Sequence, residues 1–270
     1  MGEVPADLAP DAIRAGLRTR VIGRVLEVHD VVDSTNDLAM AAGERGAAEG
    51  LCILADRQAA GRGRRGRTWM SLPGLGLYAS ILLRPGLPAE RGALITLAAG
   101  VAAAEAVGRV SGVPALVKWP NDVVLDGRKV AGILTEATTV GAELAQVVVG
   151  IGINCRHRRE DFPEELRDAA TSIALAAGRP VERQVLAAAL FNALDGWYAV
   201  LCRGDAAAVV RASRAVSAIL GREVTVLAEG RAWRGVAVNI DETGALLVQD
   251  AGGAVRRLVS EEVSVRAPSA

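Results

Sequence analysis

Seven residues in the first third of the chain, 61–67, read GRGRRGR and alternate glycine with arginine. Glycine weakens both helices and strands, and neighbouring guanidinium groups repel one another unless an anion lies among them. The stretch is therefore predicted to be a loop. Guanidinium groups on a mobile backbone bind phosphates and carboxylates through paired hydrogen bonds. The loop thus predicts an anionic ligand before any fold is known.

A disordered basic turn or an RNA-binding arm is the alternative interpretation of this loop. The chain carries 31 lysines and arginines against 31 aspartates and glutamates, and aromatic residues make up 3% of it. A broad nucleic-acid-binding face usually makes a protein more basic than this. The loop also contains a formal GxGxxG pattern, but a dinucleotide site needs small residues between the glycines and a helix after them.

The few cysteines and histidines limit the classes of protein further. Cys52, Cys155 and Cys202 are scattered without a CxxC pair, and the chain has two histidines. This argues against a structural zinc site or a disulfide framework and favours a reducing cytoplasm. The N-terminus lacks the pattern of a signal peptide. No uninterrupted apolar run of about 18 residues occurs, so we expect a cytoplasmic protein without a membrane span.

Apolar segments separated by turn residues predict a mixed α/β region followed by a small β region. Strands are expected at 24–32, 50–56, 77–83, 115–119, 123–125, 129–137 and 146–154, and helices at 10–17, 37–48, 93–110 and 181–201. Asp126-Gly127 between two apolar runs is a strong hairpin signal. After residue 211 only short strands follow, at 223–229, 231–240, 245–250, 254–259 and 264–267. They predict an SH3-like barrel, with domains at 1–217 and 218–270.

The segment Lys118-Trp119-Pro120-Asn121-Asp122 is the second candidate site. A lysine at a strand end can neutralise a phosphate, and an aspartate four residues later can hold a hard cation such as magnesium. The Asp-Gly hairpin folds Lys129 back toward this strand, so both ammonium groups are expected at one site. Each charge alone is typical of a solvated hairpin; the whole segment, with proline fixing the backbone, favours a site.

Two further segments carry polar groups where a ligand can reach them. Ser34-Thr35-Asn36 precedes a predicted helix, where Ser34 or Thr35 can be the N-cap. The same groups also form a socket for a polar, uncharged ligand head. In Gly150-Ile151-Gly152-Ile153-Asn154, the glycines predict a bulge or a close approach to the strand. A flat base could lie there, with Asn154 supplying polar contacts.

With these segments in order, the chain resembles the biotin–protein ligases (biotin–[acetyl-CoA-carboxylase] ligases). The resemblance runs from about Val28 to Arg266, and the pairing of GRGRRGR with KWPND is its most specific part. It implies an α+β fold: a catalytic domain related to class II aminoacyl-tRNA synthetases, with a mixed sheet flanked by helices, and an SH3-like domain behind it. The implied substrates are biotin and ATP with Mg²⁺, and the implied partner is the biotin carboxyl carrier protein.

The resemblance also implies a two-step reaction and residue roles. Biotin's carboxylate attacks the α-phosphate of ATP to give biotinyl-5′-AMP, and a lysine of the carrier protein then takes the biotinyl group. Catalytic roles fall to Lys129, Lys118 and Arg64. Biotin contacts are expected from Ser34, Thr35, Asn36, Gln58, Gly61, Arg62, Gly63, Arg64, Lys129 and Gly132. Nucleotide contacts are expected from Arg64, Arg67, Trp69, Lys118, Asn121, Asn154 and Arg266, and the metal contact from Asp122.

In this interpretation the arginine loop is mobile when empty and ordered over the adenylate, shielding it from water. Some bacterial relatives carry an N-terminal DNA-binding domain, which about 30 residues cannot hold, so no DNA is expected as a partner. A homodimer and a monomer both stay open. The alternatives are a lipoate or octanoate transferase of the same scaffold, with Cys155 as the candidate nucleophile, and a non-catalytic biotin-binding regulator.

Overall fold

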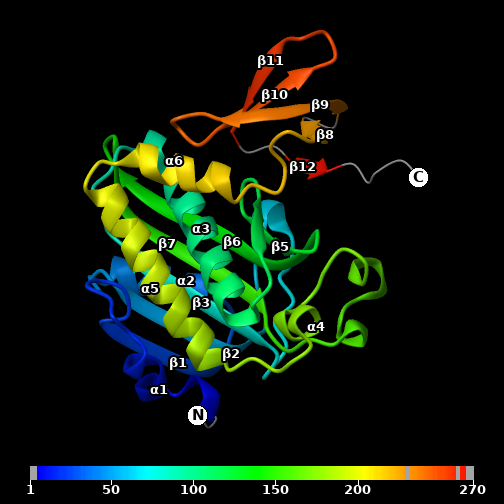
Figure 1. The fold of residues 1–270 in the computed structure, drawn as a ribbon. Helices are drawn as coiled ribbons and strands as arrows, with labels where there is room; N and C mark the ends of the chain where they lie inside the picture. The colour runs from blue at the N-terminus through cyan, green and yellow to red at the C-terminus, as the bar shows by residue number, and fades with distance from the viewer. Residues whose placement is uncertain (1–4, 229–230, 260–261, 266–270) are drawn as a thin grey trace.

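The computed structural model describes residues 5–228, 231–259 and 262–265, which form two β-sheets and their covering helices (Figure 1). The larger sheet has the strand order β1-β2-β3-β7-β6-β5-β4. Its β1–β2 pair is parallel and the other pairs are antiparallel. The strands are β1 (Val25–Val32), β2 (Leu51–Gln58), β3 (Gly76–Leu83), β4 (Ala115–Lys118), β5 (Asp122–Leu125), β6 (Arg128–Val140) and β7 (Glu143–Asn154).

The helices around this sheet arise from long apolar or capped segments. They are α1 (Pro10–Ala15), α2 (Thr35–Glu44), α3 (Gly92–Ser111), α4 (Ile173–Ala177), α5 (Arg183–Cys202) and α6 (Ala206–Ala215). Ser34 is the N-cap of α2, because its hydroxyl accepts a hydrogen bond from the Asp37 N–H at 3.4 Å. The capping prediction is confirmed, whereas the predicted helix at 37–48 already ends at Glu44. The helices α4 and α6 were not predicted.

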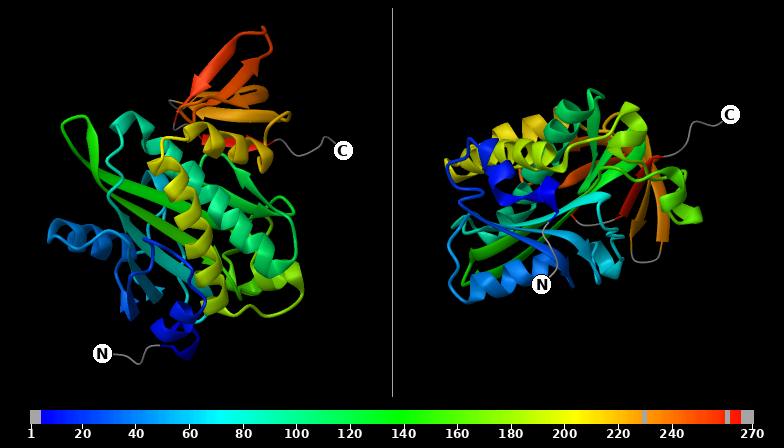
Figure 2. Two further views of the ribbon diagram at one scale, coloured as in Figure 1. Left: turned by 60° about the vertical axis from the view of Figure 1, so that its left-hand side comes forward. Right: turned by 90° about the horizontal axis from the view of Figure 1, so that it is seen from below.

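The two faces of the larger sheet are covered by different helices, as the alternation of side chains along each strand requires. On β2 and β7, Leu54 and Val147 belong to the main core beneath α3 and α5, whereas Ile53 and Val148 pack beneath α2. Figure 2, seen from below, shows α2 on one side of the sheet and α3 and α5 on the other. Because α2 is short, it covers only part of its face of the sheet, and the arginine loop covers another part.

By length and apolar composition alone, two helices could cross a membrane: the segment Ala89–Ser111, which contains α3, and α5. However, 67% and 50% of their most apolar windows are buried inside the protein. Core helices pass the same test of length and composition, so this is weak evidence for a membrane span.

The smaller sheet is antiparallel, with the strand order β11-β10-β9-β8-β12. Its strands are β8 (Glu223–Ala228), β9 (Arg231–Ile240), β10 (Leu246–Asp250), β11 (Val255–Leu258) and β12 (Glu262–Val265). The β9–β10 turn rests on the larger domain, where the buried Trp119 indole donates to the Gly244 carbonyl at 3.0 Å. A mixed sheet with helices followed by a small antiparallel unit confirms the predicted fold class.

The connection between the two sheets is hydrogen-bonded to β4 of the larger sheet. The Val117 N–H donates to the Val216 carbonyl, and the Ala218 N–H donates to the Val117 carbonyl. The predicted domain boundary at 217/218 lies in this connection and stays a prediction.

Candidate active site

The candidate active site lies on the α2 face of the larger sheet, where two glycines of β7 pair in register with residues of the adjacent strands β3 and β6. Ser80 of β3 pairs with Gly150 of β7, which pairs with Leu134 of β6. One step along the strands, Gly152 pairs with both Tyr78 and Gly132. These two rows form the floor of the site.

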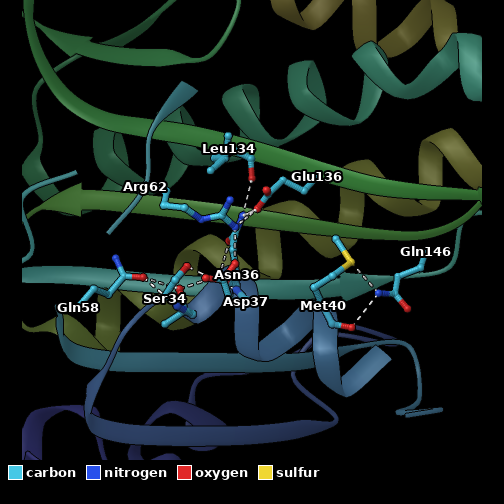
Figure 3. Close-up of polar contacts among 11 residues, drawn as sticks. Ser34, Asn36, Asp37, Met40, Gln58, Arg62, Leu134, Glu136 and Gln146 are labelled. Atoms are coloured by element: carbon cyan, nitrogen blue, oxygen red, sulfur yellow. Dashed lines mark hydrogen bonds and ion pairs between the residues drawn. The ribbon is translucent and has the colours of Figure 1, made fainter. Parts of the chain in front are cut away.

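The first row carries Asn36 from the start of α2 (Figure 3). A Cβ at Gly150 would lie 2.1 Å from the Asn36 Oδ1, so only glycine admits this side chain. The Asn36 amide donates to the Leu134 carbonyl at 3.3 Å and to the Glu136 carboxylate at 2.7 Å. The buried Ser80 hydroxyl donates to the Asn36 Oδ1 at 2.6 Å. The Asn36 amide nitrogen therefore has two acceptors, and its Oδ1 has one donor.

Thr35 and Gln58 extend this network into a polar socket. The Thr35 N–H and hydroxyl donate to the Gln58 Oε1 at 2.9 and 3.0 Å. The Gln58 amide donates in turn to the Ser71 hydroxyl at 3.0 Å. The Thr35 Oγ1 also lies 2.7 Å from the Ser80 Oγ. Ser34, Thr35 and Asn36 are at most 4% exposed, so the socket is buried, uncharged and held in one arrangement.

The second row carries Trp69, whose indole lies against the paired glycines. A Cβ at Gly152 would lie 2.5 Å from the indole, and one at Gly132 would lie 2.9 Å from it. The close approach predicted from the glycines is therefore confirmed. The proposed flat base against the sheet is corrected: at Gly152 the flat group is the protein's own indole, and at Gly150 the space holds Asn36.

The arginine loop closes over both rows as a short irregular hairpin. The Gly63 N–H donates to the Arg67 carbonyl at 2.7 Å, and the Trp69 N–H donates to the Gly61 carbonyl at 2.9 Å. The Arg62 guanidinium pairs with Asp37 at 2.5 Å and with Glu136 at 2.8 Å. The Arg64 guanidinium donates to the Asn121 Oδ1 at 2.9 Å. The loop prediction is confirmed, and Arg64 joins the loop to the candidate segment from Lys118 to Asp122.

Lys129 is held beside Asp122 by the backbone of β6. A register shift between Val123 and Val124 marks an irregularity in the β5–β6 pairing, next to the turn at Asp126 and Gly127. The Lys129 N–H donates to the Ala169 carbonyl at 2.8 Å. Its ammonium lies 2.6 Å from the Asp122 carboxylate and 5.4 Å from the centre of the Trp69 ring. The hairpin therefore does return Lys129 to the strand end, as predicted.

Two adjoining cavities share Gly63, Arg64, Trp69, Asn121 and Lys129 in their walls. The smaller, of about 60 Å³, lies over the two rows. It is lined by the predicted residues Ser34, Thr35, Asn36, Gln58, Arg62, Gly63, Arg64, Trp69, Asn121, Lys129 and Gly132. The larger, of about 540 Å³, is lined by the predicted residues Gly63, Arg64, Arg67, Trp69, Lys118, Asn121, Asp122, Lys129 and Asn154.

Two predicted site residues are not among the described wall residues of the cavities. Gly61 lines neither cavity; it is buried, and a Cβ there would lie 2.4 Å from the Trp69 carbonyl oxygen. Arg266 lies outside the described residues. All the other predicted site residues meet in the walls of the two cavities.

The donor set of the larger cavity decides which metal fits. Asp122 is the one carboxylate among its described wall residues. No group of three or more histidine, cysteine, aspartate or glutamate side chains suited to a metal occurs in the described part of the chain. Magnesium is usually held by one or two protein carboxylates together with substrate phosphates. The site therefore fits magnesium that enters with a nucleotide and does not fit a metal caged by protein alone.

Several residues of the site were not predicted from the sequence. Ser80 and Glu136 complete the Asn36 network, and Ser71 holds Gln58. The far wall of the larger cavity comes from the segment after β7 and from the smaller sheet: Phe162, Pro163, Leu166, Ala169, Ala170 and Val263. The alternation of side chains along β3 and β6 is the signal that would have found Ser80 and Glu136, because every second residue of a strand lies on the same face of the sheet.

Cys155, the candidate nucleophile of the alternative transferase, is poorly suited to that role. Its side chain is completely buried, and its thiol donates to the Ile153 carbonyl at 3.5 Å. Burial raises the pKa of this thiol to about 12. A reactive cysteine needs an accessible thiolate, so the geometry disfavours a cysteine-based transfer.

The fold and the site together define a ligase of the biotin/lipoate class. Residues 28–154 match the Biotin/lipoate A/B protein ligase family, and residues 219–266 match the Biotin protein ligase C terminal domain. The chain belongs to the biotin protein ligase family. The predicted family, fold class and ligase activity are thereby confirmed.

Individual relatives support this assignment. The chain is 33% identical over 261 residues to the Bifunctional ligase/repressor BirA of Bacillus subtilis, covering 97% of this chain and 80% of that protein. It is 34% identical over 226 residues to the Biotin–[acetyl-CoA-carboxylase] ligase of Paracoccus denitrificans, covering 82% and 92%. Among solved structures, the biotin protein ligase from Aquifex aeolicus in complex with biotin and ATP has a TM-score of 0.76 at 30% identity, covering 90% of this chain and 99% of that one.

Proposed function

We propose that this protein activates biotin with ATP and transfers it to a lysine of a biotin carboxyl carrier protein. In the first step a biotin carboxylate oxygen attacks the α-phosphorus of ATP, and pyrophosphate leaves. In the second step the carrier's lysine amine attacks the acyl carbon of biotinyl-5′-AMP, and AMP leaves as an amide forms. The observation that carries the proposal is an uncharged, buried socket adjoining a cavity lined by five cationic side chains.

The socket suits the neutral ring system of biotin. The ureido group of that ring offers two N–H donors and one carbonyl acceptor. Thr35 and Gln58 supply a hydroxyl and an amide at the socket, and these groups can donate or accept as the ligand requires. Their existing hydrogen bonds fix their positions, so little side-chain entropy is lost when biotin binds. Ser34, Thr35, Asn36 and Gln58 are therefore assigned to the biotin head.

The cationic cavity suits the two reacting anions. The carboxylate of biotin and the triphosphate of ATP repel one another unless positive charge lies between them. Lys129 lines both cavities, and this supports a role for its ammonium between the carboxyl end of biotin and the α-phosphate. Lys118 and Arg64 line the nucleotide side. We assign to these three residues the electrostatic stabilisation of the transferring groups, and Lys129 later polarises the acyl group.

Asp122, with the triphosphate, would hold the magnesium ion. When bound, magnesium neutralises charge on the phosphate oxygens. The carboxylate of Asp122 now pairs with Lys129, and nucleotide binding would offer both groups new partners of opposite charge. Trp69, Asn121, Asn154 and Arg67 are assigned to the nucleotide; the proposed contact of Arg266 with it rests on the resemblance alone. The proposed compartment is the cytoplasm.

Transfer of labelled biotin to an apo carrier domain, with and without ATP, tests the function. We expect ATP-dependent labelling of a single carrier lysine, with release of pyrophosphate and AMP. Tight biotin binding without transfer would instead identify a regulator. Transfer of lipoate in place of biotin would identify the other enzyme of this scaffold.

A further inference from the structure

The cationic residues of the chain are distributed unevenly between lysine and arginine. The sequence contains two lysines and 29 arginines. Both lysines, Lys118 and Lys129, line the larger cavity of the candidate active site. The other cationic residues in the described wall of this cavity are arginines: Arg64, Arg65 and Arg67. Everywhere else in the chain, the cationic side chains supply positive charge without a lysine amine.

The difference between the two residue types bears on the intermediate of the proposed reaction. Biotinyl-5′-AMP is a mixed anhydride, so a neutral amine that reaches its acyl carbon can take the biotinyl group. The nitrogen lone pair attacks this carbon, the bond from the carbon to the phosphate oxygen breaks, AMP leaves, and water takes the proton from nitrogen. A lysine amine, with a pKa of about 10.4, is neutral in a small fraction of molecules near neutral pH, whereas a guanidinium stays charged. An arginine therefore attracts the anion without competing for its acyl group.

The two lysines of the site are each given to an anion. The Lys129 ammonium lies 2.6 Å from the Asp122 carboxylate, so it would have to leave an ion pair before its nitrogen could attack. Lys118 has no ion-pair partner among the described contacts, and the proposed function assigns its ammonium to the phosphates of the nucleotide. An ammonium has no lone pair, so neither lysine attacks the acyl carbon while it holds its anion.

Other nucleophilic side chains are also kept away from the acyl group. Cys52 and Cys155 are completely buried, and Cys202 lies at the end of α5 and lines neither cavity. Tyr78 lines the smaller cavity, but it is 1% exposed and its hydroxyl donates to the Leu72 carbonyl at 3.1 Å. Serine and threonine hydroxyls are weak nucleophiles unless a base activates them. Apart from the two lysines, the described walls of both cavities therefore carry neither an amine nor a thiol.

We propose that the exposed arginines in the wall of the larger cavity keep this enzyme inert toward its own adenylate, and that a lysine in their place would become a second acceptor of biotin. Because it needs biotinyl-5′-AMP as the intermediate, the proposal rests on the proposed function. Arg65, which is exposed and lines this cavity, thereby acquires a role in acceptor specificity. The carrier's lysine remains the one amine that meets the acyl carbon in a neutral state.

Two matched pairs of variants test this proposal, each incubated with biotin and ATP in the absence of a carrier protein. Arg65→Lys places an amine in the wall of the larger cavity, and Arg109→Lys places one near the end of α3, outside both cavities. Leu166→Lys and Leu175→Lys form the second pair, because these leucines are 43% and 42% exposed and Leu166 alone lines a cavity of the site. Thermal unfolding verifies the fold of each variant.

Mass spectrometry of the proteins and of their proteolytic peptides measures the biotin bound per chain, with the α-amine of the N-terminus counted separately. We expect about tenfold more biotin on Arg65→Lys and on Leu166→Lys than on the matched variant of each pair, since a group held beside a reacting group acts at a high effective concentration. This labelling should require ATP and rise with pH by up to about tenfold per unit, as the neutral fraction of a lysine amine does. The unmodified protein should carry no biotin on Lys118 or Lys129.

Three results would overturn the proposal. Biotin on Lys118 or Lys129 of the unmodified protein would show that the enzyme is not inert toward its adenylate. Absence of label from both Arg65→Lys and Leu166→Lys would show that the arginines protect nothing. Equal labelling within each pair would show that the adenylate reacts only after it has left the cavity.

Pyrophosphate release and labelling of an apo carrier domain by the unmodified protein are measured in parallel. If neither occurs, the proposed function fails and the protection of the enzyme from its adenylate fails with it. If both occur while the variants behave as in one of the three contrary results, the proposed function stands and the role of the arginines alone is rejected.

Discussion

The two adjoining cavities are built in opposite ways. The socket side consists of uncharged groups joined by hydrogen bonds, from Thr35 to Gln58 and from Ser80 to Asn36. The other side consists of arginines and lysines at a partly exposed surface, with Asp122 as the one described carboxylate in its wall. Recognition of a neutral ring depends on fixed hydrogen-bond positions. Handling of phosphate depends on charge, which acts over a longer range and tolerates movement.

Lys129 stands between the two sides, and its removal should have the largest effect. Lys129→Ala removes the one ammonium that lines both cavities. Loss of one preorganised stabilising group typically costs about 10²–10³ in rate, and we expect this loss in adenylate formation. Pyrophosphate release measures it, and thermal unfolding of the variant serves as control. A rate equal to that of the unmodified protein would remove Lys129 from the reaction.

The two glycines of β7 offer a matched pair of changes, one on each side. Gly150→Ala puts a methyl group against Asn36, and Gly152→Ala puts one against Trp69. Overpacking of this kind costs about 1–3 kcal/mol. We expect roughly tenfold weaker binding of biotin in the first variant and of ATP in the second. Calorimetric titration of each ligand measures the change. If both variants lose the same ligand, the two sides are not separate.

Thr35→Val tests the socket more gently, because valine keeps the shape of threonine and removes its hydroxyl. The Gln58 Oε1 and the Ser80 hydroxyl each lose one partner. One hydrogen bond is worth about 1 kcal/mol net, so biotin affinity should fall about fivefold while ATP affinity is unchanged. A change in ATP affinity of the same size would contradict a socket dedicated to biotin.

The smallest effect on catalysis is expected at the far wall of the cationic cavity. A change there should instead alter how the free energy of unfolding depends on pH. His157 is completely buried and stacks on Phe162 at 5.2 Å, and its two ring nitrogens have no hydrogen-bond partner among the described residues. Burial lowers its pKa to about 4, and the nearby Asp161 offsets this only in part. An unfolded histidine, with a pKa of about 6.5, binds a proton more readily than the folded one.

The sign of the pH effect follows from this difference. The contribution of His157 to the free energy of unfolding is fully present above pH 6.5. As the pH falls toward 4, this free energy decreases by up to about 3 kcal/mol. His157→Phe keeps the stacking surface and should flatten the free energy of unfolding between these pH values, as urea denaturation would show. If the slope of the unmodified protein and the variant is the same, His157 is not responsible.

Most of the fold could be predicted from the sequence, because each strand of the larger sheet is a separate apolar run bounded by turn residues. Asp126-Gly127 marked its hairpin, and both residues have positive φ. The helix α6 was not predicted, although Val209, Val210 and Ser213 give it one buried face. The helix α2 ends at Glu44 because Gly46, just after its C-cap Arg45, has a positive φ that a helix does not continue through.

The site could be predicted wherever a motif is local, as in Lys118 to Asp122 and the arginine loop. Ser80 and Glu136 could not be found this way. Neither belongs to a local motif, and the role of each comes from the register that aligns β3, β7 and β6. The wall from Phe162 to Ala170 comes from an irregular segment that has no repeating pattern to read.

A crystal structure with biotinyl-5′-AMP bound tests the division between the two sides most directly. We predict the ureido ring within hydrogen-bond distance of Thr35 and Gln58, and the phosphate within reach of Lys129 and Lys118. The arginine loop should be closed over the adenylate. A ureido ring in the cationic cavity, or a phosphate that contacts neither lysine, would contradict the account.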